Sequence, residues 1–257
     1  MTAVAHKIKL YMFTGSGPSM TARLMLEHKG LEHSEVHMIL GPHAFSLLGR
    51  GFVTMQVPAL KIDGRRVQGS RWIARALDEL VPDPALFPAD PELRREVVAA
   101  EGWGEGLQDA TRRLVLCAAR RDPAAFHAVY RHPSALRRPA QHLSRPVVVR
   151  LAAAAHRATD EAAKEDVAEL DDRLGQVDAW IAAGVLDGPE LNAADFQIAP
   201  SIALLLGFAD LAPIVEGRPA AALARRVVHG DLAAVDPVLP AEWLRGDTAV
   251  AAGSRRG

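Results

Sequence analysis

The sequence predicts a small α/β domain at the N-terminus followed by an all-helical domain, and three observations lead to this prediction. In residues 1–81, β-prone runs alternate with helical patterns. Residues 82–91, the predicted linker, belong to a proline-rich stretch that suits a stiff connection better than a helix or a central strand. Residues 92–244 carry apolar side chains at helical spacing, and residues 245–257 are expected to be a disordered polar tail.

The first domain is expected to contain its elements in the order strand, helix, strand, loop, strand, strand, helix. The first β-prone run ends in the Gly- and Pro-containing turn 14–18, and the amphipathic run after it stops at Gly30, a typical C-cap. Asp63-Gly64 lies between two short β-prone runs and predicts a hairpin. The predicted strands are residues 8–13, 34–40, 57–62 and 65–68, and the predicted helices are residues 19–29 and 70–80.

Beyond Leu80 no comparable strand signal appears, and the helical pattern dominates. Apolar residues between 167 and 181 repeat at three and four residues, which predicts a narrow buried seam. Asn192-Ala-Ala-Asp195 precedes a long apolar run and has the character of a helix N-cap. Residues 121–145 combine several prolines with many Arg and His residues, so we expect a connection with short helical pieces there.

Composition excludes several classes of protein. The 257 residues include 30 Lys and Arg against 31 Asp and Glu, so there is no basic excess for binding nucleic acid. The single cysteine, Cys117, excludes an internal disulfide and a Cys-rich zinc or iron–sulfur centre, and no metal is predicted. No apolar run is long enough to cross a bilayer and no secretion signal is visible, so we expect a cytoplasmic protein without membrane contact.

Several short motifs, taken in order, resemble the glutathione S-transferase superfamily. The turn Ser16-Gly17-Pro18-Ser19 looks like the thioredoxin CxxC site with serines in both cysteine places, and also like the corresponding turn of serine-type transferases. Gln56-Val57-Pro58-Ala59-Leu60 and Gln68-Gly69-Ser70-Arg71 match two further segments of the first domain. Residues 86–91 resemble the family's linker, and residues 192–195 resemble a helix cap of its second domain. The resemblance covers about residues 8–120 and 165–230.

This resemblance implies a thioredoxin-like domain that binds glutathione, a helical domain that binds an apolar electrophile, and a homodimer active in detoxification. It implies that Ser16 donates a hydrogen bond to the thiolate, which lowers the thiol pKa. A cis proline after Val57 would dock the tripeptide backbone, and Ser70 would hold a carboxylate at a helix N-terminus. The remaining implied glutathione-binding residues are Gln56, Pro58, Gly69 and Arg71. Gly69 departs from the family, which commonly has an acidic or amide side chain there.

The tyrosine-type variant looks absent, because Met12 stands where that family carries its phenol. Tyr11 is one residue away, which on a strand turns its side chain to the opposite face.

Each of these residues also has a purely structural interpretation. Ser16, Ser19 and Ser70 are suitable helix caps, and Pro58 could simply maintain a turn. Gln56 and Arg71 could be solvated surface residues. The function alternatives are a non-catalytic binding or interaction protein of the same fold, and a glutaredoxin-like reductase. The reductase is disfavoured because the 16–19 turn contains no cysteine.

Two other groups of polar residues attract attention. His33 and His37 could share one face of a strand, but without a third ligand they predict a solvated edge rather than a metal site. Four arginines gather near the end of one predicted helix, where they suit either a solvated last turn or an anionic surface. They are Arg112, Arg113, Arg120 and Arg121.

Overall fold

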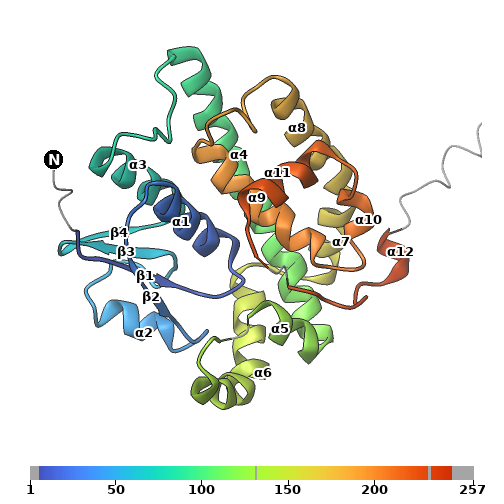
Figure 1. The fold of residues 1–257 in the computed structure, drawn as a ribbon. Coiled ribbons are helices and arrows are strands. Elements are labelled where there is room, and N and C mark those ends of the chain that lie inside the picture. The colour runs from blue at the N-terminus through green and yellow to red at the C-terminus, as the bar shows by residue number, and fades with distance from the viewer. Residues whose placement is uncertain (1–5, 131, 231–232, 245–257) are drawn as a thin grey trace, which may run out of the picture.

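The computed structural model describes residues 6–130, 132–230 and 233–244. Its N-terminal part is a four-stranded sheet with helices on both faces, and its C-terminal part is helical throughout (Figure 1). The predicted fold class, a thioredoxin-like domain followed by an all-helical domain, is confirmed. The predicted domain boundaries stay a prediction, because one hydrophobic cluster contains residues of both parts, including Leu10 and Phe196.

The sheet has the strand order β2-β1-β3-β4, in which β1 and β2 are parallel and the other neighbours are antiparallel. The strands are β1 (Ile8–Met12), β2 (Ser34–His37), β3 (Ala59–Ile62) and β4 (Arg65–Gln68). Helices α1 (Gly17–His28) and α3 (Ser70–Leu80) lie over one face of the sheet, and α2 (His43–Leu48) lies over the other (Figure 1).

The two faces of β1 belong to different clusters. Met12 packs with the main core, whereas Tyr11 packs beside Leu47 of α2 and Phe52. The expectation that Tyr11 and Met12 face opposite sides of the sheet is therefore confirmed.

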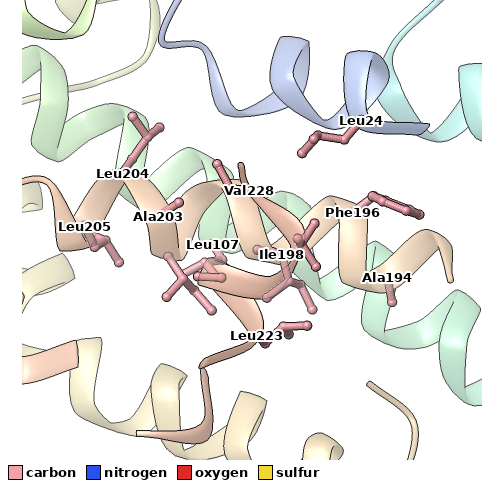
Figure 2. Close-up of a cluster of buried hydrophobic side chains, with 14 of the residues drawn as sticks. Leu24, Leu107, Ala194, Phe196, Ile198, Ala203, Leu204, Leu205, Leu223 and Val228 are labelled. Carbon is pink, nitrogen blue, oxygen red and sulfur yellow. The ribbon is translucent and has the colours of Figure 1, made fainter. Parts of the chain in front are cut away.

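The helical part is built around α9 (Ala193–Leu206), which passes between α1, α4 and α11 (Figure 2). All but the last of its residues are buried, which explains why its sequence is apolar on every side. The predicted cap is confirmed as a capping box, in which Asn192 and Asp195 satisfy each other's backbone amides. The other helices are α4 (Pro91–Arg121), α5 (Pro123–Val129), α6 (Arg138–Ala155), α7 (Asp160–Ala168), α8 (Leu170–Ala182), α10 (Ala212–Val215), α11 (Pro219–Val227) and α12 (Ala241–Leu244), with a 3-10 turn at Ala135–Arg137.

Three sequence predictions need correction. The second strand ends at His37 rather than at residue 40: the Met38 amide still donates to the Met12 carbonyl at 2.8 Å, but Met12 is the last residue of β1, so the parallel ladder stops there. The segment predicted as a loop contains the six-residue helix α2. The connection 121–145 is more ordered than predicted: α6 alone has 18 residues, with Pro146 inside it. The predicted tail 245–257 lies outside the described residues.

Candidate functional site

Three predicted segments meet at one end of the sheet, called its edge, where β1 and β4 end and β3 begins. Tyr11 near the end of β1 is paired with Ala59, and Ala59 is paired with Gln68 at the end of β4. The turn after β1, the segment before β3 and the start of α3 therefore all lie beyond this edge. The Gly69 amide donates to the Pro58 carbonyl at 3.0 Å, which ties two of these segments together.

Ser16 is half-buried and is the N-cap of α1. Its Oγ accepts a hydrogen bond from the Ser19 amide at 3.4 Å, and Ser19 Oγ in turn accepts one from the Phe13 amide at 3.3 Å. The capping role of Ser16 is thus confirmed, whereas Ser19 is a first-turn residue of α1 whose hydroxyl bonds to the backbone just after β1 instead of capping the helix. Capping does not conflict with thiol activation, because a hydroxyl that accepts a hydrogen bond keeps its own hydrogen to donate.

The segment before β3 has the expected cis peptide bond between Val57 and Pro58, and a second cis bond precedes Pro84. Among the residues described, neither the amide nor the carbonyl of Val57 has a protein partner. Gln56 is exposed. The side chain of Gln68 bonds to backbone groups of Thr54 and Gln56 and so holds this segment in place.

The start of α3 is not capped by a side chain. The N-cap is Gly69, which has a φ of 87°, a value that favours glycine, and Ser70 is the first residue of the helix. The interpretation of Ser70 as the cap is therefore wrong. Among the residues that the structure describes, no side chain caps the first-turn amides of α3, an arrangement that suits an anion.

Arg71 is engaged with the helical domain. It pairs with Glu101 at 3.2 Å and with Glu105 at 3.1 Å, and Arg75 also contacts Glu101 at 2.6 Å. The Glu101 side chain is only 1% exposed. Since its charge is met by these carboxylates, Arg71 is positioned to join the two domains, and its role toward glutathione stays a prediction.

A small cavity of about 20 Å³ lies against Ser16. This volume suits one water molecule, not a tripeptide. Neither Val57 nor Ser70 lines it. Its walls are Gly15, Ser16, Gly17 and Pro18 of the first domain and Gln108, Thr111, Arg112, Val115, Tyr130, Ser201 and Leu204 of the helical part.

The end of helix α5 lies against Gly15, one of the residues that line the cavity. A Cβ atom placed on Gly15, whose φ is 76°, would lie 1.9 Å from the Val129 carbonyl oxygen. Only glycine permits this close approach. The end of α5 is therefore seated directly on the Ser16 corner.

Sequence reasoning missed the residues that the helical domain contributes to this cavity. Thr111 and Ser201 are buried, and Tyr130 lies just after α5. Burial raises the pKa of the Tyr130 phenol above its usual value, so this group stays protonated. The chain has only two tyrosines, and this rarity is the one feature of the sequence that could have drawn attention to Tyr130.

The other candidate residues form ion pairs. Glu35 lies between His37, at 2.9 Å, and His33, at 3.8 Å, and the hydrogen bonds from these imidazoles hold the pKa of Glu35 far below its usual value. Within the described ranges, no three His, Cys, Asp or Glu residues are placed to hold a metal ion.

The four clustered arginines are also paired. Arg112 contacts Asp109, Arg113 contacts Asp166, and Arg120 and Arg121 contact Asp160. Burial raises the pKa of the nearby Cys117 thiol to about 11, so this thiol is unreactive at neutral pH.

In residues 6–130, 132–230 and 233–244, no helix combines the length and the apolar character that crossing a membrane requires.

The fold and the edge of the sheet define a two-domain protein in which a thioredoxin-like domain faces a helical domain. Residues 10–85 match the family model described as glutathione S-transferase, N-terminal domain. The N-terminal part is thus similar to the first domain of glutathione S-transferases, and solved structures that cover most of the chain share its fold.

Similar proteins span different parts of the chain. Maleylacetoacetate isomerases of Rattus norvegicus and Mus musculus are each 36% identical over 94 residues, which are 35% of this chain and 44% of the isomerase. The alignment thus spans less than half the length of these curated relatives. Rice GST1 in complex with glutathione has a TM-score of 0.60 at 20% identity and 87% coverage of both chains. A glutathione S-transferase from Rhodospirillum rubrum has a TM-score of 0.57 at 19% identity, with 93% of this chain and 98% of that chain covered.

Proposed function

We propose that the protein is a glutathione-dependent transferase or isomerase that joins the thiol to an apolar electrophile. The observation that carries the proposal is the convergence of Ser16, the unpaired backbone of Val57 and the uncapped start of α3 at one edge of the sheet. The family match over residues 10–85 and the rice structure in complex with glutathione support the choice of thiol. Detoxification in the cytoplasm is the role that we propose for it.

Ser16 stabilises the ionised sulfur. A free thiol has a pKa of about 8.5, and lowering it by two units takes about 2.7 kcal/mol of preferential stabilisation of the anion. The Ser16 hydroxyl supplies a donor, and the positive end of α1 adds to it. The Ser16 oxygen meanwhile keeps its hydrogen bond from Ser19.

Val57 and Ser70 hold the rest of the ligand. The Val57 amide and carbonyl are placed to pair with a peptide backbone, and the amides at the start of α3 are placed to bind a carboxylate. The thiol supplies the nucleophile, and its sulfur forms a bond to carbon. In a substitution the electrons of the broken bond leave with the departing group, and in an addition they stay on the adjacent carbon, which takes up a proton. The thiol proton passes to solvent.

One observation favours the second candidate, a non-catalytic binding protein. The cavity at Ser16 holds about 20 Å³, and the end of α5 lies on it. An electrophile must therefore enter from the open edge of the sheet or displace α5.

The parent protein distinguishes the two functions. Calorimetric titration with glutathione, followed by a conjugation assay with 1-chloro-2,4-dinitrobenzene, is expected to give binding and turnover. Glutathione binding without turnover of this or of a panel of Michael acceptors favours the non-catalytic protein, and the absence of glutathione binding refutes the glutathione-dependent enzyme.

We propose a homodimer, supported by two exposed apolar surfaces. Around α2, Phe45 is 80% exposed and Val53 is 91% exposed. On one side of α6, Leu143 is 86% exposed and Leu151 is 66% exposed. Light scattering after gel filtration should give twice the monomer mass, and Phe45→Lys should lower it; a parent that elutes as a monomer refutes the dimer.

A further inference from the structure

Five polar side chains form a buried seam between α1, α4 and α9. Gln108 donates to Thr21 Oγ1 at 3.3 Å and to the Gln197 carbonyl at 3.1 Å, and Thr21 donates to the Phe196 carbonyl at 2.8 Å. The other two members are Thr111 and Ser201. Such a seam is unusual in a core that is otherwise apolar, because each buried polar group needs a hydrogen-bond partner.

Two hydroxyls of this seam have no such partner. Thr111 is 3% exposed and Ser201 is 1% exposed, and within the described part of the chain neither Oγ1 of Thr111 nor Oγ of Ser201 has a hydrogen bond. Both residues line the cavity at Ser16. Ser201 Oγ lies 3.7 Å from the position that a Cβ on Gly17 would take, which places it at the first turn of α1.

The cavity has the size and the polarity of a hydration site. A water molecule needs about 10–15 Å³ of such space and two to four polar partners. The cavity has about 20 Å³, and three hydroxyl-bearing residues from separate helices, Ser16, Thr111 and Ser201, are among those that line it.

We propose that Thr111 and Ser201 hold one water molecule in this cavity, and that this water donates to Ser16 Oγ. Ser16 then accepts from the water and from the Ser19 amide, so both of its lone pairs are used. Its hydrogen is left for the sulfur. Thr111 and Ser201 are thus positioning residues that act through Ser16, and the inference rests on the proposed function.

The charged and titratable groups nearest this corner are Arg112 of α4, Tyr130 after α5 and His37 of β2. Tyr130 after α5 has a pKa above its usual value because it is buried. His37 of β2 is connected to this corner only through Thr14, whose Oγ1 lies 3.2 Å from His37 Nδ1. It is unchanged in every variant compared.

The pH dependence of kcat/KM tests the positioning. The probes are glutathione and 1-chloro-2,4-dinitrobenzene. In Thr111→Val/Ser201→Ala we expect the apparent pKa of the bound thiol to rise by about one pH unit, which is about tenfold lower kcat/KM below it, with KM for glutathione changed less than twofold. The variant Thr111→Ser/Ser201→Ala keeps a hydroxyl at position 111, and its pH profile should lie closer to that of the parent. A double variant with the parental profile overturns the positioning role.

Thermal unfolding tests the water independently of activity. If a water joins these hydroxyls, the double variant loses hydrogen bonds and its Tm should fall by about 2–4 °C. If the cavity is dry, removal of two unpartnered hydroxyls raises Tm, and the hydration site is overturned. An unchanged rate in Ser16→Ala would refute the proposed function instead, and the Tm comparison still decides on the water.

Discussion

Substitution of Gly15 by alanine tests whether α5 is seated on the Ser16 corner. Two costs add at this position. The left-handed backbone, with a φ of 76°, costs an alanine about 1–2 kcal/mol. The new methyl group would also lie 1.9 Å from the Val129 carbonyl oxygen, and overpacking of this kind costs about 1–3 kcal/mol. The expected loss of unfolding free energy is therefore about 2–5 kcal/mol.

Gly30 offers a matched control for this substitution. It has a φ of 62°, and a Cβ placed on it meets nothing within 4 Å. Gly30→Ala should therefore show the backbone cost alone. The assay is urea unfolding followed by circular dichroism, with the slopes compared to check two-state behaviour. If Gly15→Ala is no more destabilising than Gly30→Ala, α5 does not rest on the corner and the description of the cavity is wrong.

Two further predictions concern stability. Glu101→Ala should lower the unfolding free energy by about 2–4 kcal/mol, because it leaves Arg71 and Arg75 without their buried partner. Glu105→Ala removes a side chain that is 55% exposed and should cost less than about 1 kcal/mol in the same urea assay. Equal losses would contradict the proposed ion-pair bridge between the domains. Burial raises the pKa of Asp195 to about 6, against the hydrogen bonds from Asn192 and Asp187, so the folded chain binds this proton more tightly than the unfolded chain. Its stabilising contribution is therefore fully present only below the unfolded pKa of 3.8 and is lost as the pH rises through 6. Relative to Asp195→Asn, the parent should lose about 3 kcal/mol of unfolding free energy between pH 3 and pH 7, and a constant difference would refute the shift.

Local signals in the sequence predicted much of the fold. Gly30 ends α1, Asp63-Gly64 joins β3 to β4, and Asn192 begins α9, each because the neighbouring backbone needs that residue type. The helix α6 was missed because its prolines suggested a broken segment. One of them, Pro139, stands in the first turn, where the missing amide costs little, and Pro146 is accommodated inside the helix.

The candidate site was predictable only where it depends on the first domain. Ser16, Val57 and Ser70 belong to motifs that follow or precede strands, and sheet register brings them to one edge. Thr111 and Ser201 are 90 residues apart in sequence, and neither belongs to a recognisable motif. Only the packing of α4 and α9 against α1 brings them to Ser16, and no local pattern encodes that packing.

The central claim is that the Ser16 hydroxyl activates a thiol in addition to capping α1. Ser16→Ala removes both roles, whereas Ser16→Asp keeps a capping oxygen but has no hydrogen to donate when ionised. The decisive measurement is kcat for conjugation of glutathione to 1-chloro-2,4-dinitrobenzene in both variants, with the unfolding free energy measured alongside. We predict that Ser16→Ala loses about 1 kcal/mol of stability and Ser16→Asp little, while both lose turnover by about ten- to a hundredfold. Parental turnover in Ser16→Ala would contradict the account.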